Sequence, residues 1–263
     1  MKFALVNEER IEAQPKLVGE CPCCGSEMIA RCGDVYAHHW AHKGRRKCDP
    51  WWENETDWHR SWKNQFPEDW QERIQFANDG EKHIADVKTE DGWVIEFQHS
   101  AIKADERNSR EAFYKRLVWV INGKRRKFDE KKFREAWEEA GKPLGPEEPL
   151  RALSFYEGRL LNEWVGRPAH ILLDFGEEDW LWWLIPRRQL SGDLVFRINR
   201  AGLIQCLGPI ADRGEHSLDQ IIEVLTDLLK RRELMLKIEQ SVRGKRRIKH
   251  DPLAIRRRPH RRM

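Results

Sequence analysis

Two short segments, His83-Ile-Ala-Asp-Val-Lys88 and Trp93-Val-Ile-Glu-Phe-Gln98, decide how this sequence folds. Both have the residue alternation of strands, and the stretch between them, Thr89-Glu-Asp-Gly92, ends in a glycine that suits a left-handed turn position. We therefore predict an antiparallel hairpin closed by the three-residue loop Glu90-Asp91-Gly92. In the register that this loop sets, Asp86 lies directly opposite Glu96, on the same face as Val94 and Gln98.

Two carboxylates that face each other in a sheet repel one another unless a cation lies between them. Hard oxygen ligands of this kind suit Mg²⁺ or Mn²⁺, so Asp86 and Glu96 form a candidate catalytic metal site. The alternative is an exposed strand face that tolerates both charges.

A helical pattern precedes the hairpin, with apolar residues at positions 51, 58, 62 and 66. Glu55, His59 and Lys63 lie four residues apart, so they share one stripe of this helix. Such a stripe can be a ladder of ion pairs on the surface. Because the predicted hairpin that follows brings Asp86 and Glu96 face to face, we favour a set of catalytic side chains instead.

Five of the six cysteines lie in the first 48 residues, beside several histidines. Cys21-Pro-Cys-Cys24-Gly25 has the spacing with which two thiolates bind one Zn²⁺, and the glycine permits the turn. The second ligand pair is either His39 with His42, or one of these two histidines with Cys48. Buried thiols and surface histidines are the alternative interpretation. Two further cysteines are expected to be bystanders: Cys23 and Cys32.

These motifs together resemble the competence protein CoiA family, within the PD-(D/E)xK nuclease superfamily. In that superfamily an Asp ends one strand, (D/E)-x-K lies on its hairpin partner, and a Glu often comes from the preceding helix. The resemblance covers about residues 15–125. It rests on these matches, in chain order: Cys21, Cys24, His39-Trp-Ala-His42, Glu55, His59, Asp86 and Glu96-Phe-Gln98.

The resemblance implies an α/β (α+β) fold with a restriction-endonuclease-like PD-(D/E)xK core and a zinc-ribbon-like module. It also implies that Asp86, Glu96 and the Phe97 carbonyl hold Mg²⁺ or Mn²⁺. The other roles that it implies are water orientation by Gln98, completion of the metal shell or base catalysis by Glu55, and contacts of His59 and Lys63 with the phosphate or leaving group.

One position departs from the superfamily pattern, because Gln98 stands where a lysine is usual. A glutamine can orient water through its amide but carries no positive charge, which Lys63 could supply instead. We therefore expect a metal-dependent DNA nuclease of bacterial DNA uptake, recombination or defence. The alternatives are a non-catalytic nucleic-acid adaptor that loads DNA for a partner enzyme, and an RNA-directed nuclease.

The predicted organisation has four parts: a zinc module at 1–50, the nuclease-like core at 51–142, a C-terminal α+β unit at 150–242 and a basic tail at 243–263. A Pro- and Gly-rich stretch at 141–149 reads as a linker. Further predicted elements are a helix around 103–116 capped by Ser100, a buried strand at 117–122, a hairpin of 169–175 with 180–185, strands at 194–198 and 203–207, and a helix of about 24 residues opened by Ser217-Leu-Asp-Gln220.

Charge is divided unevenly along the chain. Residues 243–263 contain ten Lys and Arg against one acid, a net charge of +9, whereas residues 1–242 carry −5. Such a tail is typical of an arm that binds phosphates, so DNA is the expected partner. We also expect a partner protein or a homo-oligomer through the C-terminal unit.

No apolar run reaches the length of a membrane span, and the N-terminus lacks a secretory signal. The expected location is therefore the cytoplasm, without membrane contact.

Overall fold

The computed structural model describes residues 1–34, 36–44, 55–77, 80, 82–140, 150–153, 156–186, 193–213 and 216–249. For residues 239 and 243–249 it describes the backbone alone. The chain forms two compact units, Met1–Glu215 and His216–Met263.

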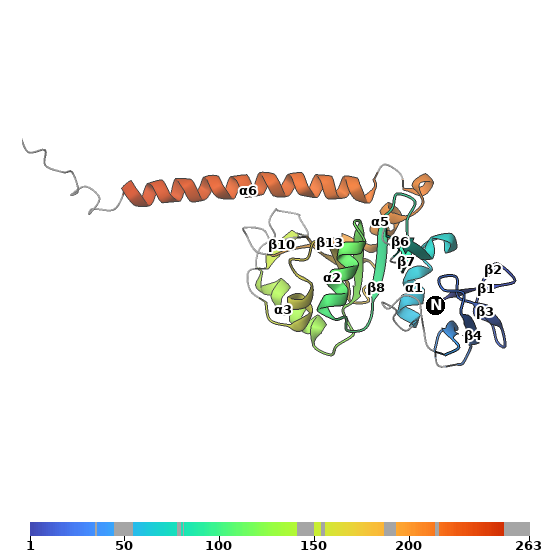
Figure 1. The fold of residues 1–263 in the computed structure, drawn as a ribbon. Helices are drawn as coiled ribbons and strands as arrows, with labels where there is room; N and C mark the ends of the chain where they lie inside the picture. The colour runs from blue at the N-terminus through green and yellow to red at the C-terminus, as the bar shows by residue number, and fades with distance from the viewer. Residues whose placement is uncertain are drawn as a thin grey trace, which may run out of the picture. The chain divides into compact units, whose positions relative to one another are not determined.

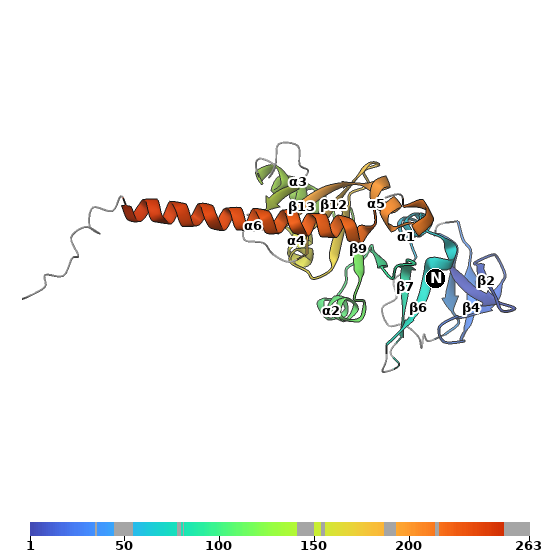
Figure 2. The same cartoon turned by 90° about the horizontal axis from the view of Figure 1, so that it is seen from above.

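A small antiparallel sheet forms the N-terminal part of the first unit, with strand order β2-β1-β3-β4-β5. Its strands are β1 Phe3–Val6, β2 Glu9–Glu12, β3 Val18–Glu20, β4 Glu27–Arg31 and β5 His39–His42. Met28 and Trp40 are fully buried in its core, together with Cys23. Ile74 and Ile84 of the second sheet pack against this core, so the two sheets lie side by side (Figures 1 and 2).

The second sheet has eight strands in the order β6-β7-β8-β9-β11-β12-β13-β10. β8, β9 and β11 are parallel to one another, and the other neighbours are antiparallel. The strands are β6 Gln71–Phe76, β7 Lys82–Lys88, β8 Val94–Gln98, β9 Leu117–Asn122, β10 Leu150–Leu153, β11 His170–Asp174, β12 Trp180–Leu184 and β13 Asp193–Asn199.

The predicted hairpin is formed by β7 and β8, and its register is confirmed. Val87 pairs with Ile95 and Lys88 with Val94, while the loop closes through a 2.9 Å hydrogen bond from Thr89 N to Trp93 O. Gly92 has φ +84°, a left-handed conformation that favours glycine. The ladder ends at Val87 and Ile95, so the predicted Asp86–Glu96 pair lies just beyond its last paired residues.

Helices cover both faces of the central strands. β9 is buried along its whole length, as predicted for residues 117–122. Trp119 contacts α4 (Arg159–Trp164) on one face, and α3 (Asp129–Glu139) packs on Trp182 of the same face. On the opposite face, Trp62 of α1 (Asp57–Lys63) stacks on Phe97, with ring centroids 5.7 Å apart.

Two local predictions are wrong. Residues 203–207 belong to helix α5 (Arg200–Leu207) and not to a strand, because the Asn199 side chain caps the helix by accepting from Gly202 N. Ser100 does not cap α2 (Ala104–Phe113), which has Lys103 at its N-cap and no side-chain cap. The Ser100 carbonyl instead accepts hydrogen bonds from Gln98 and Arg125.

The predicted hairpin of residues 169–185 is confirmed as β11 and β12. β11 pairs with β9, so strands from both sides of residues 141–149 share one sheet. The predicted boundary between the core and a C-terminal α+β unit therefore falls inside a continuous sheet, whereas the two compact units divide after residue 215. The predicted linker, 141–149, lies outside the described residues.

The second unit contains one helix, α6 (Leu218–Lys249), among its described residues. The predicted capping box is confirmed, because Ser217 Oγ accepts from Gln220 N and Gln220 Oε1 accepts from Ser217 N. At 32 residues the helix is longer than the predicted 24 or so. In the described part of the chain, no helix combines the length and the apolar character that a membrane span requires.

Asp174, at the end of β11, holds α1 against the sheet. Its Oδ2 accepts hydrogen bonds of 2.9 Å from the indole N–H groups of Trp58 and Trp62. Its Oδ1 accepts from Gly176 N and from Arg200. The side chain is 3% exposed, so these bonds form away from bulk water, where losing them is costly.

We predict that Asp174→Ala lowers the free energy of unfolding by on the order of 3 kcal/mol, because it leaves a cation and two indole donors without their acceptor. Urea unfolding followed by tryptophan fluorescence measures this change. Asp179→Ala is the matched control, because Asp179 is exposed. Equal stability of the two variants would contradict the role of Asp174.

Candidate functional site

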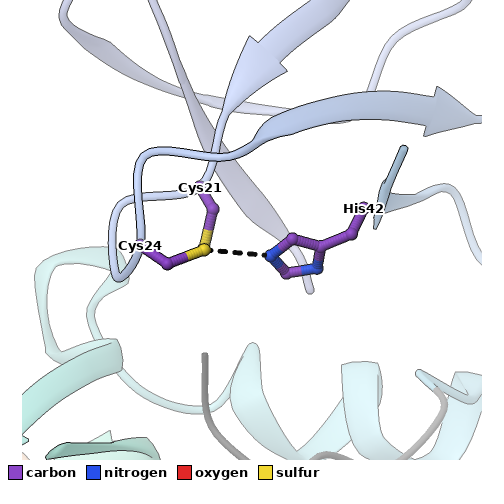
Figure 3. Close-up of side chains that lie close together, drawn as sticks. All are labelled: Cys21, Cys24 and His42. Atoms are coloured by element: carbon purple, nitrogen blue, oxygen red, sulfur yellow. Dashed lines mark hydrogen bonds between the residues drawn. The ribbon is translucent and has the colours of Figure 1, made fainter. Parts of the chain in front are cut away.

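Cys21 and Cys24, in the turn between β3 and β4, converge with His42, the last residue of β5 (Figure 3). One ligand atom from each lies within 4.8 Å of the other two, and Cys24 Sγ is 3.5 Å from His42 Nε2. The turn at the cysteines is closed by a hydrogen bond from Gly25 N to Cys21 O, with Gly25 in the left-handed region at φ +67°. Two thiols and an imidazole are a donor set that fits Zn²⁺.

Strand alternation separates the two candidate histidines. His39 and His42 lie three residues apart on β5, so they point to opposite faces. His39 Nδ1 is 2.9 Å from Ala37 O and is not part of the cluster, whereas His42 is. Of the alternatives left open by the sequence, the geometry therefore favours His42 with Cys48. Cys48 itself lies outside the described residues.

The remaining cysteines of this region pack in apolar surroundings. Cys23 is buried in the core of the small sheet, and Cys32 packs against it. Burial raises the pKa of the Cys21 thiol above its usual value. Without a metal, a buried thiol such as that of Cys21 stays protonated. A bound cation would lower its pKa and favour the thiolate.

Of the predicted stripe, only His59 and Lys63 lie on α1, because the helix begins after its Thr56 cap and Glu55 precedes that cap. All three side chains are buried against the second sheet and not on the surface. The Lys63 ammonium is 2.7 Å from Glu55 Oε2 and 3.0 Å from Glu72 Oε1. His59 Nε2 lies 2.5 Å from the Phe97 carbonyl oxygen. Lys63 therefore binds the acidic pair Glu55 and Glu72, and His59 contacts the backbone of β8.

Glu72, in β6, is the main residue of this region that the sequence analysis did not identify. Its carboxylate accepts hydrogen bonds from Lys2 N at 2.6 Å and Phe3 N at 3.0 Å, so it also binds the first strand of the small sheet. Its backbone has φ +47°, a left-handed conformation that is rare outside glycine. The alternating pattern of 71–76 could have indicated a strand, but the contact with β1 has no signal in the sequence.

The charges in this group shift one another's pKa. Burial alone would raise the pKa of Glu72, but the Lys63 ammonium and the backbone donors outweigh it and lower that pKa to about 2. Burial also opposes the charge on Lys63, yet Glu72 and Glu55 raise the pKa of Lys63 above its usual value. All three groups therefore stay charged at neutral pH.

Asp86 and Glu96, which lie just beyond the paired residues of β7 and β8, have different partners. Asp86 Oδ2 accepts a 2.9 Å hydrogen bond from Phe97 N, and Glu96 Oε2 accepts one of 2.8 Å from Arg110 of α2. Burial raises the pKa of Asp86, and the nearby Lys63 and His59 offset this only in part. Among Glu55, Glu72 and Asp86, Asp86 alone has a raised pKa, so its negative charge is the least compensated of the three.

The structure does not gather the predicted acids into a cluster of metal-binding size. Within the described ranges, the Cys21–Cys24–His42 group is the only set of three or more potential ligands that lie that close together. Glu55 binds Lys63 and Arg60, and Glu96 binds Arg110. The Mg²⁺ or Mn²⁺ site thus has no direct support from this geometry.

We predict that the purified wild-type protein binds about one zinc ion per chain, and that His42→Ala lowers both the zinc content and the melting temperature. His39→Ala is the matched control and should retain zinc. Metal analysis by mass spectrometry and a thermal melt measure both. Full zinc retention in His42→Ala, or loss in His39→Ala, would show that the ligands are misassigned.

The low pKa of Glu72 predicts a pH dependence of stability. Its carboxylate is ionised in the fold down to about pH 2 but has an ordinary pKa of 4.5 when unfolded, so it stabilises the fold above pH 4.5 and loses this effect as the pH falls towards 2. Glu72→Gln should cost on the order of 3 kcal/mol at neutral pH and flatten the acid limb of the stability curve. Urea unfolding over this pH range measures both, with exposed Glu68→Gln as the control; an unchanged acid limb would contradict the assignment.

Three comparisons with known proteins bear on this chain. Residues 9–50 match the family model described as the competence protein CoiA, N-terminal domain. Nothing among the curated proteins and nothing among the solved structures matches the chain. The matched range includes all three members of the Cys21–Cys24–His42 group, and the resemblance to the CoiA family is confirmed for this part of the chain. Residues 9–50 are thus similar to the N-terminal domain of the competence protein CoiA.

Proposed function

We propose that the protein is a metal-dependent DNA phosphodiesterase of the PD-(D/E)xK type that acts in the cytoplasm during competence-related DNA processing. The matched CoiA domain supports the competence-related setting. The observation that carries the proposed activity is the meeting of Asp86, the Phe97 backbone and His59 at the place where the ladder between β7 and β8 ends.

The order of elements supports this proposal. Helix α1 is followed by the antiparallel strands β6, β7 and β8, then by helix α2 and by β9, which runs parallel to β8. Asp86 lies on the second of these strands and Glu96-Phe-Gln98 on the third, as in the superfamily that the sequence resembles. Arg110 of α2 reaches Glu96, which places that helix over the acidic strand.

The chemistry would use a divalent cation held by oxygen atoms of Asp86, Glu96 and the Phe97 carbonyl. Such a cation activates a water molecule and stabilises the charge that develops on the phosphate. The raised pKa of Asp86 supports a site that benefits from a cation. Glu96 would exchange Arg110 for the cation, and the freed guanidinium could then bind a phosphate oxygen.

The remaining residues would position these groups. His59 fixes the Phe97 carbonyl, and Gln98, whose amide donates to the Ser100 carbonyl, would orient water. Glu55 is engaged by Lys63 and Arg60, so it supports α1 and acts on the metal only after rearrangement. DNA would be attracted mainly by the tail, with its net charge of +9 over residues 243–263.

A second candidate function is a non-catalytic DNA adaptor, and one specific observation favours it. Arg110 already neutralises Glu96 through a buried ion pair, with side chains 7% and 3% exposed. A permanent pair of this kind would exclude the cation and leave a domain that binds DNA without cutting it. Cleavage assays distinguish the two functions.

We predict that wild-type protein cleaves DNA with Mg²⁺ or Mn²⁺, and that Asp86→Ala abolishes cleavage and keeps the fold. Gln98→Lys, which introduces the lysine usual in the superfamily, should preserve or raise the rate. Asp86→Asn should raise the melting temperature without metal, because it removes a poorly compensated, half-buried charge. Labelled single-stranded DNA, duplex DNA and RNA are the substrates, and circular dichroism checks folding.

Asp105→Asn is the control, because it also replaces an aspartate by asparagine but at an exposed position of α2. This variant should cleave DNA at the wild-type rate. Cleavage by Asp86→Ala at that rate would place the active site elsewhere. A wild type that cuts no substrate with either metal, yet binds DNA, would favour the adaptor. Cleavage of RNA alone would change the substrate class.

A further inference from the structure

One row of α6 is apolar and exposed. Five of its side chains are 46–60% exposed and are spaced four, seven, three and four residues apart: Val224, Leu228, Met235, Ile238 and Val242. Arg231 fills the gap in this pattern. With Arg231, these residues occupy the alternating three- and four-residue positions of a coiled-coil seam. We call these six residues the α6 seam.

The rest of the helix follows the same seven-residue repeat. One side of the helix away from the seam is polar and carries Glu223, Thr226, Lys230, Glu233, Lys237 and Gln240. Leu234, which is 59% exposed, flanks the seam. A second apolar row, which is less exposed than the seam, contains Leu218, Ile222, Leu225, Leu229 and Leu236. The seam is an exposed apolar surface along 224–242, just under three heptads and close to the minimum for a coiled coil.

Charge varies along α6 in a way that identifies a partner. Residues 218–229 contain three acids and no base, a net charge of −3. Residues 237–248 contain five bases and one acid, a net charge of +4. A second copy of the helix running in the opposite direction would place each acidic stretch beside a basic one.

The seam residues also fit this antiparallel arrangement. With the two copies centred on residue 233, Val224 meets Val242, Leu228 meets Ile238 and Arg231 meets Met235. A parallel arrangement would instead bring Arg231 against its own copy and place two basic tails side by side, and both contacts are repulsive. The antiparallel pair is two-fold symmetric, so the same surface serves both copies.

We propose that the protein is a homodimer held by an antiparallel coiled coil of α6 through this seam. The dimer would carry its two basic tails at opposite ends of the coil, so that one particle could bind DNA at two separated points. This inference is independent of the proposed cleavage, because it concerns assembly alone.

Light scattering on the full-length chain tests the dimer. Wild type should have twice the 31.4 kDa chain mass, and Met235→Glu should have the mass of one chain, because it places a charge in the seam. Gln240→Glu, which adds the same charge on the polar side, should remain dimeric. Circular dichroism and zinc content show whether the variants fold. A monomeric wild type, or a dimeric Met235→Glu, would overturn the proposal.

Cysteine cross-linking tests the direction of the two helices. A mixture of Val224→Cys and Val242→Cys chains should form a disulfide-linked dimer, whereas Val224→Cys chains alone should not exceed the wild-type background. Efficient linkage of Val224→Cys chains with one another would show a parallel pair and reject the antiparallel arrangement. The dimer should also weaken as salt rises, because complementary charges contribute to it.

Discussion

The ammonium group of Lys63 is the feature on which the arrangement around the candidate site depends. Its side chain is only 2% exposed, and an unpaired buried ammonium would cost several kcal/mol. Glu55 and Glu72 supply the two carboxylates that make its burial possible. Because Glu55 directly precedes the Thr56 cap of α1 and Glu72 belongs to β6, the pairing fixes where α1 lies on the sheet.

Glu72 extends this constraint to the small sheet. The carboxylate that binds Lys63 also accepts from the backbone of Lys2 and Phe3, so one side chain joins α1, β6 and β1. The left-handed backbone of Glu72 costs on the order of 1–3 kcal/mol, which the buried hydrogen bonds and ion pair offset. The position of the CoiA-like domain on the core thus depends on electrostatics as well as on apolar packing.

The sequence predicted the features that depend on local rules. The hairpin register followed from the loop with Gly92, the buried strand from the apolar run at 117–122, and the Cys21–Cys24 turn from spacing. Contacts between distant segments could not be predicted in this way. Glu72 pairs with residues about seventy positions away, and no periodic pattern signals such a contact.

Local sequence patterns also failed to predict one helix and the partners of several charged side chains. Residues 203–207 are apolar enough for a strand, but the cap at Asn199 starts a helix there. Glu96 was expected to face a cation shared with Asp86, and in the fold it meets the guanidinium of Arg110. Sequence spacing indicated that Glu96 needed a positive partner, but not which group would supply it.

These ion pairs also indicate which residue could replace the positive charge of the lysine that is usual at the position of Gln98. Lys63 was a candidate for the missing positive charge, yet its ammonium is already shared by Glu55 and Glu72, two carboxylates for one cation. The hydrogen bonds of this ammonium are therefore directed to two buried carboxylates and not to a phosphate. Arg110, which has a raised pKa despite its burial because of Glu96 and Glu106, keeps its charge and lies on the same strand face as Gln98. If a cation displaces it from Glu96, Arg110 is therefore better placed than Lys63 to compensate for the lysine that Gln98 replaces.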